Sequence, residues 1–476
     1  MTALSVAGHQ RLATAAIIGG AMLWIISGDW LPAAAVGVLW VIWRVLPDES
    51  GPPILAVAMS YQWVQVTVGM IYAVVTGRTL LPMQQIDYHP IVIISLCGLL
   101  AITTGLWVGR ALVGQDTGRS DANPNLAFTW GMLLGSYLLT TGVEGLARGF
   151  AFANPSLTQP ILALTTIRLI VLYVLFRRLT HPEFQWGKLI ALVLWELVLN
   201  STGYFANFRE PLILAMIAIA EVFDWDNPRH LITVGALAVG LAFASLVWLS
   251  IRADFREEIN ARESFSRSDR LSAIATLVSD WWRGDEFKSR DDQIDFLVER
   301  VWAVYYPALA LQRVPRTLPH TNGELLRAAV LHTLQPRIFF PEKPELPSDS
   351  ELVRRYSGVY VAGREQNTSI AFGYVAESYV DFGTPILLVP MVLFGIAIGA
   401  IYGGFQRTLR FAEFRIPTIV VVFWLSLYLY ERSWANMMGY SLTLFVYVGL
   451  VALLLDRIIL IRFEAPSIPE IADTLA

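Results

Sequence analysis

The chain has 476 residues, of which 55% are hydrophobic and only 16% are charged, and its mean hydropathy is +0.53. Soluble domains usually carry about 25% charged residues, so this composition excludes an ordinary soluble protein and indicates an all-α protein embedded in a membrane. The formal net charge of -4 is small, and no nucleic-acid partner is expected. Cys97 is the single cysteine, which excludes an intrachain disulfide framework.

Apolar runs predict about twelve transmembrane helices, because the hydrocarbon core of a bilayer needs roughly 20 apolar residues per helix. Those within residues 1–250 lie near 12–28, 31–47, 53–76, 90–113, 126–147, 158–178, 188–208, 211–223 and 231–250. The run at 211–223 is short enough to be a re-entrant helix instead. The last spans, within residues 382–476, lie near 382–404, 416–431 and 438–460.

Lysine and arginine in the short loops set the orientation, because these residues concentrate on the cytoplasmic side of a membrane. Most of them fall on one side if both termini are cytoplasmic. That topology leaves one large hydrophilic insert, residues 251–381, as an extracytoplasmic loop. Helical spacing of its apolar residues predicts amphipathic helices, whereas the prolines that recur from Pro307 to Pro347 predict breaks in regular structure.

The insert ends in a segment that carries two cations between prolines, Pro336-Arg337-Ile338-Phe339-Phe340-Pro341-Glu342-Lys343-Pro344. Proline restricts its own backbone and that of the preceding residue, so we expect a stiff, extended loop. Arg337 and Lys343 on such a loop can hold a phosphate or diphosphate. The alternative is a solvated loop in which the cations pair with Glu342 or Glu345.

Two further charged side chains lie on the same predicted side of the membrane. Glu377 precedes the tenth span, which we expect to begin near Gly383. Partial burial would raise its pKa and suit a general base, although a capping or ion-pair role is the alternative. Arg209 ends the seventh span beside Pro211, where a helix break can form an anion site. The alternative there is a snorkelling interfacial arginine.

Arg168 and Glu196 fall near the middle of neighbouring predicted spans. Charges at that depth are costly and usually pair, so we expect these two to pair with each other. The pair is either a structural clamp or part of a proton path. The six histidines show no metal-ligand spacing, so no metal and no cofactor are expected.

The pattern Pro-Arg-x-x-x-Pro-x-Lys-Pro at 336–344, together with Glu-x-Tyr-x-Asp-Phe-Gly at 377–383, resembles the Wzy-type polymerases of O-antigen, capsule and exopolysaccharide repeat units. Arg209 ahead of a short apolar segment and the large loop toward the C-terminus are also similar to that family. The resemblance implies a type C membrane glycosyltransferase fold in the bacterial inner membrane, with the loop in the periplasm. It also implies metal-independent, inverting transfer between undecaprenyl-diphosphate-linked donor and acceptor glycans, with a chain-length regulator and a flippase as partners.

The resemblance further implies residue roles. Glu377 would be catalytic, activating the acceptor hydroxyl. The diphosphate would bind to Arg209, Arg337, Lys343 and Arg364, and the glycan contacts would be Arg313, Arg316, His320 and Tyr379. Two other functions stay open. An O-antigen ligase shares the fold and loop but depends on an extracytoplasmic His/Arg pair, and a lipid-linked oligosaccharide flippase or transporter is favoured only by Arg168 and Glu196.

Overall fold

The computed structural model of the chain describes residues 6–48, 51–114, 129–154, 157–181, 183–201, 209–222, 228–261, 267–283, 290–337, 339–340, 342–366 and 368–464. Within these ranges all regular secondary structure is helical. Six helical stretches are long and apolar enough to cross a membrane, and they are Ile54–Thr76, His89–Val113, Thr158–Thr180, Ile232–Arg252, Leu388–Thr408 and Trp434–Ile458. The described structure is therefore that of a helical protein with several candidate membrane spans.

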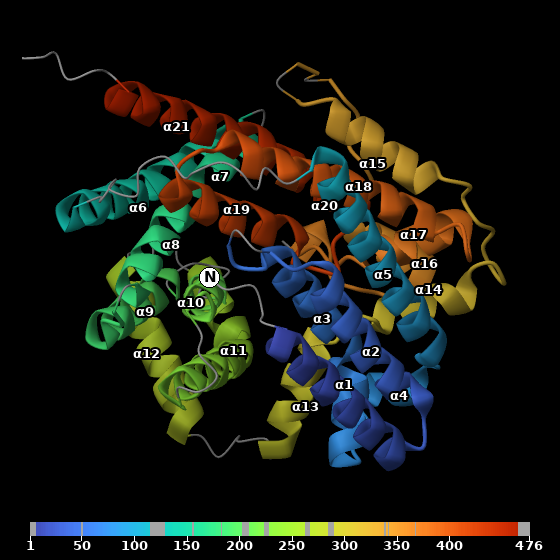
Figure 1. Ribbon diagram of the computed structural model, residues 1–476. Helices are drawn as coiled ribbons and strands as arrows, with labels where there is room; N and C mark the ends of the chain where they lie inside the picture. The colour runs from blue at the N-terminus through green and yellow to red at the C-terminus, as the bar shows by residue number, and fades with distance from the viewer. Residues whose placement is uncertain are drawn as a thin grey trace, which may run out of the picture.

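The helices before the insert form two groups (Figure 1). The first group is α1 (Val6–Ser27), α2 (Trp30–Val45), α3 (Ile54–Thr76), α4 (Leu81–Gln85) and α5 (His89–Val113). The second is α6 (Trp130–Ala153), α7 (Thr158–Thr165), α8 (Ile167–Thr180), α9 (Trp186–Ser201), α10 (Arg209–Ala220) and α11 (Pro228–Ala261).

The C-terminal helices connect these groups. They are α18 (Leu388–Thr408), α19 (Ala412–Leu427), α20 (Trp434–Thr443), a π turn η2 (Leu444–Val448) and α21 (Gly449–Glu464). Helix α19 packs against α3 of the first group and α8 of the second. A helix lies at each predicted span position, and the total of twelve spans stays a prediction because only six stretches of the described residues satisfy length and apolarity together.

The insert is more helical than the prolines predict. Its helices are α12 (Arg267–Arg283), α13 (Arg290–Val301), α14 (Tyr305–Arg313), α15 (Glu324–Leu334), α16 (Asp349–Ser357) and α17 (Tyr374–Phe382), with a 3-10 turn η1 at Arg364–Gln366. The expectation of broken structure from Pro307 onward was wrong for α14 and α15. Pro307 lies in the first turn of α14, where a helix does not need the missing backbone N–H.

Two local expectations near the end of the insert also need correction. The 336–344 segment is not extended: the backbone N–H groups of Phe339 and Phe340 both donate to the carbonyl of Pro336, at 3.0 Å. Ile338 and Pro341 lie outside the described residues. The helix at the predicted tenth span, α18, begins at Leu388 and not near Gly383, because Gly383, with φ of +64°, ends the separate short helix α17.

Helices α5 and α18 approach until their backbones touch. Cβ atoms placed on Gly105 and Gly109 of α5 would lie 2.3 and 2.1 Å from the carbonyl oxygens of Val392 and Ile396. The contact is reciprocal, because a Cβ on Gly399 of α18 would lie 2.3 Å from the carbonyl oxygen of Leu106. Small residues permit this close approach between membrane helices. The glycines therefore fix where α18 lies, and with it the short helix α17 that precedes it.

Buried glutamines on α3 hold the loop between α19 and α20, residues 428–433. Gln65 donates from Nε2 to the carbonyl of Tyr428 at 2.7 Å, and its Oε1 accepts from the N–H of Tyr430 at 3.3 Å. Gln62 accepts from the hydroxyl of Tyr374 at 2.7 Å, which ties the start of α17 to the same helix. Buried polar groups need such partners, so α3 sets the positions of α17 and of the loop that leads into α20.

The close contact of Gly399 with α5 leads to a prediction for which Gly404, in the same helix, provides the control. Gly399→Ala should destabilise the protein by about 1–3 kcal/mol, because the added methyl group must displace the backbone of α5. Gly404→Ala lies in the same helix with no atom within 4 Å of the new Cβ, so it should be neutral or stabilising. Thermal unfolding of the detergent-solubilised variants would measure this. Equal melting temperatures for the two variants would contradict it.

Candidate functional site

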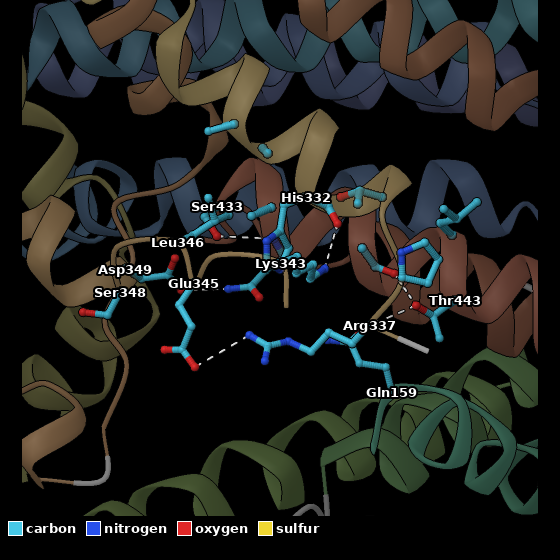
Figure 2. A pocket seen from close by; sticks show the side chains of 18 of the residues that line it. Gln159, His332, Arg337, Lys343, Glu345, Leu346, Ser348, Asp349, Ser433 and Thr443 are labelled. Carbon is cyan, nitrogen blue, oxygen red and sulfur yellow. Dashed lines mark hydrogen bonds and ion pairs between the residues drawn. The ribbon is translucent and has the colours of Figure 1, made fainter. Parts of the chain in front are cut away.

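A cavity of about 780 Å³ lies between α15 and α20, and Figure 2 shows it from close by. Its lining also includes the start of α7, the 336–348 segment, the start of α16 and Glu377 of α17. We call it the α15–α20 cavity. Four of the site residues predicted from the sequence line it, and they are Arg337, Lys343, Arg364 and Glu377.

The three cations have two kinds of partner: Lys343 contacts a backbone carbonyl, whereas Arg337 and Arg364 share one carboxylate. Lys343 donates from Nζ to the carbonyl of His332, in the last turn of α15, at 2.9 Å. Arg337 lies 3.6 Å and Arg364 2.7 Å, nitrogen to oxygen, from the carboxylate of Glu345. The alternative considered for this segment, pairing with Glu345, is therefore present for Arg337 but not for Lys343.

His332 also lines the cavity, a position that sequence reasoning did not single out. Burial lowers its pKa, and the charges of Lys343 and Arg337 lower it further, so the imidazole is neutral near pH 7. Burial and the charge of Arg337 likewise lower the pKa of Lys343. These shifts reflect a group of cations that faces a partly dehydrated space.

Glu377 lies at the closed side of the cavity with only 3% of its surface exposed. Its Oε2 accepts a hydrogen bond of 2.8 Å from the backbone N–H of Trp434, the first residue of α20. Its Oε1 accepts no hydrogen bond from the described residues. Burial raises the pKa of Glu377 to about 8, opposed by the Trp434 bond and assisted by the charges of Asp349 and Asp381. A carboxyl with this pKa can exchange a proton near neutral pH.

Helix α17 carries a second buried carboxylate, one turn after Glu377. Asp381 accepts hydrogen bonds from the backbone N–H groups of Leu325, at 3.1 Å, and Leu326, at 2.8 Å, in the first turn of α15. Each carboxylate thus caps the positive N-terminal end of a different helix, Glu377 at α20 and Asp381 at α15. Because these helices form facing walls, α17 sets the width of the cavity.

Arg209 does not line this cavity. It begins α10 and donates from Nη2 to the hydroxyl of Tyr428 at 3.2 Å, with Glu210 Oε1 at 3.3 Å. Its guanidinium also lies over the Tyr428 ring, 5.3 Å from the centroid, and Arg432 lies 5.1 Å from the same centroid. Arg209 therefore contacts the 428–433 loop, and Ser433 at the end of this loop lines the cavity.

The four residues considered as glycan contacts lie away from the α15–α20 cavity. Tyr379 donates its hydroxyl to the carbonyl of Val314 at 3.1 Å, and His320 Nδ1 lies 3.0 Å from the carbonyl oxygen of Tyr379. Arg313 ends α14. Arg313, Arg316 and His320 belong to the segment around Val314, Tyr379 of α17 contacts it, and none of the four lines the cavity. Their glycan-binding role stays a prediction.

The expected contact between Arg168 and Glu196 is present, with Nη2 and Oε2 2.7 Å apart. Further contacts surround the pair: Glu144 lies 3.1 Å from Arg168 Nε, Asn200 donates to Glu196 Oε2 at 2.9 Å, and the hydroxyl of Tyr137 donates to Glu196 Oε1. None of these side chains lines the cavity.

Comparison with known proteins identifies a family that this chain matches. A family model described as "Domain of unknown function (DUF8712)" matches residues 131–447, well over half of the chain. The chain belongs to this family. The DUF8712 region begins in α6 and ends in η2, and it contains every residue that lines the cavity, from Thr158 to Tyr447. No curated protein and no solved structure matches the chain.

The raised pKa of Glu377 predicts a stability effect. The folded state binds this proton more tightly than the unfolded chain does, so ionisation of Glu377 should reduce stability as pH rises from about 4.5 to about 8. Glu377→Gln removes that contribution, and its melting temperature should fall less over this pH range. Glu365→Gln is the control, because this side chain is 49% exposed and hydrogen bonds from its own backbone N–H and from Arg354 lower its pKa, so the carboxylate stays ionised over this range. Parallel curves for wild type and Glu377→Gln would contradict the expectation.

Proposed function

We propose that the chain is a polymerase that joins undecaprenyl-diphosphate-linked oligosaccharide repeat units into a surface polysaccharide. The observation that carries the proposal is one cavity that combines Arg337, Lys343 and Arg364 with the buried carboxyl of Glu377. The cations suit an anionic diphosphate, and the carboxyl suits the activation of a sugar hydroxyl.

The polarity of the cavity supports a lipid-linked substrate. Its wall runs from Asn436 of α20, near Asp349, to Leu442 of α20 and Val446 of η2, all in the candidate span Trp434–Ile458. The helix rises by about 1.5 Å per residue, so the lining extends roughly 15 Å into the span. A cationic end and an apolar end in one cavity suit a ligand with an anionic headgroup and a hydrocarbon chain.

The proposed step needs no metal. The acceptor hydroxyl oxygen attacks the anomeric carbon of the donor from the face opposite the diphosphate, and the bond from that carbon to the diphosphate oxygen breaks. The hydroxyl proton passes to Glu377, and Arg337, Lys343 and Arg364 stabilise the charge that develops on the diphosphate. Attack from the opposite face gives inversion at the anomeric carbon.

The same proposal includes a topology. Twelve spans, with both termini cytoplasmic and the insert 251–381 in the periplasm of a bacterial cell, would place the cation segment and Glu377 at one membrane surface. This topology is supported by the position of the cavity at the N-terminal end of the candidate span Trp434–Ile458. Residues 1–250 and 382–476 would then form the membrane domain.

One observation favours a ligase as the second candidate. His332 lines the cavity together with Arg337, and the charge of Arg337 contributes to the lowered pKa of this histidine. An extracytoplasmic His/Arg pair is the feature that the ligase alternative requires. A flippase gains less support, because the Arg168–Glu196 pair is surrounded by partners, as a structural clamp would be.

Deletion of the gene distinguishes these functions. Loss of a polymerase should leave single repeat units exported and attached at the cell surface, with long chains absent from both the carrier and the surface. Gel analysis of surface glycan and mass spectrometry of carrier lipids would measure this. Long chains that accumulate on the lipid would indicate a ligase, and loss of single units from the outer face would indicate a flippase.

Site variants test the residue roles. The double variant Arg337→Ala/Lys343→Ala and the single variant Glu377→Gln should each reduce chain extension by about 100-fold or more, because they remove charge stabilisation and the base. Arg327→Ala, an exposed residue of α15 that does not line the cavity, is the matched control. Extension would be measured in membranes with equal amounts of each protein. Normal chain lengths in both site variants would refute the assignment.

A further inference from the structure

The carboxylate of Glu345 is shared by two arginines at the open side of the α15–α20 cavity. Oε1 faces Arg337 at 3.6 Å and Oε2 faces Arg364 at 2.7 Å. Figure 2 shows Arg337 and Glu345 reaching toward each other from opposite sides of the cavity. One carboxylate therefore bridges two cations that come from different segments of the insert.

Glu345 is ionised in this position. The hydrogen bond and charge of Arg364, followed by the charge of Arg337, lower the pKa of this carboxyl. Lys343 is held differently, because it donates to the carbonyl of His332 and pairs with no carboxylate of the described residues. Glu345 thus partly neutralises the two arginines, whereas no carboxylate of the described residues neutralises the lysine.

The geometry resembles an anion-binding site occupied by a carboxylate of the chain itself. Arginine forks bind carboxylates and phosphates through the same N–H groups. A ligand anion that binds the N–H groups facing Glu345 on both Arg337 and Arg364 must therefore displace this carboxylate. Glu345 and Arg364 are both more than half exposed at their side chains, and exposed ion pairs contribute little energy, so displacement is feasible.

We propose that Glu345 is a specificity-determining residue that occupies the anion site of Arg337 and Arg364 until a diphosphate group displaces it. The inference rests on the proposed function, because it takes the diphosphate of the lipid carrier as the ligand. A diphosphate brings several charges and can contact both arginines and Lys343 together. A ligand carboxylate would only replace one carboxylate with another, so the exchange selects for the more highly charged group.

A structural role makes the opposite prediction. If Glu345 served only to hold the 336–345 segment against Arg364, its loss would loosen the site and weaken anion binding. If Glu345 competes with the ligand, its loss should strengthen binding. The sign of the change in affinity therefore separates the two roles.

The experiment uses the full-length chain in detergent, with inorganic diphosphate as the probe and isothermal titration calorimetry at low ionic strength. Glu345→Gln should bind diphosphate roughly tenfold more tightly than wild type, because a negative charge next to both arginines is removed. Glu342→Gln makes the same change in net charge in the same segment, outside the cavity lining, and should differ from wild type by less than about twofold. In the background Arg337→Ala/Arg364→Ala, which removes both arginine partners of Glu345, the effect of Glu345→Gln should be lost.

The outcomes separate this inference from the proposed function. Unchanged or weaker binding by Glu345→Gln, with binding still dependent on Arg337 and Lys343, would overturn the role of Glu345 and leave the diphosphate site in place. Binding that is insensitive to Arg337→Ala/Lys343→Ala, or the absence of binding in wild type and Glu345→Gln alike, would overturn both.

Discussion

The backbone contact between α5 and α18 is the constraint on which the position of the cavity depends. Gly105, Gly109 and Gly399 lie against the backbone of the opposite helix, and a Cβ atom at any of these positions would collide with it. A short connection after Gly383 joins α17 to α18, so α17 has little freedom once α18 is placed. Its two carboxylates then hold the first turns of α15 and α20. Close backbone contacts at these three glycines thus determine the separation of two cavity walls, although none of the three lines the cavity.

Two features of the surroundings of Glu377 have opposite effects on the stability of its ionised form. As the partner of the Trp434 N–H it is stabilised by the positive end of α20, whereas burial opposes its charge. A residue that serves only as a helix cap would be more stable in a wetter position. The raised pKa is therefore a cost to folding, and such costs are concentrated at functional sites.

Much of this arrangement could be predicted from the sequence, but not its long-range part. Apolar runs locate the helices because burial in a membrane demands length and apolarity, and prolines flanking Arg337 and Lys343 identify a non-helical cationic segment. Helix α17 was missed because nine residues between Gly373 and Gly383 are too short for a periodic signal. The placement of Arg209 on Tyr428 and of His332 beside Arg337 depends on tertiary packing. Ser433, whose hydroxyl accepts a hydrogen bond from the N–H of Asn436, is the N-cap of α20 and was a local signal for the start of that helix.

The π turn at Leu444–Val448 divides one candidate span into two helical registers. A π turn accommodates about one extra residue, which rotates the helix beyond it by roughly 100° relative to a continuous α-helix. Cavity-lining side chains end at Tyr447, whereas Asp456 of α21 accepts hydrogen bonds from the backbone just before α19, at Arg410 and Phe411. Both halves pack against α19, but the first half also lines the cavity and the second also contacts the backbone at Arg410 and Phe411. The π turn therefore lets one candidate span present one register of side chains to the cavity and another to the backbone just before α19.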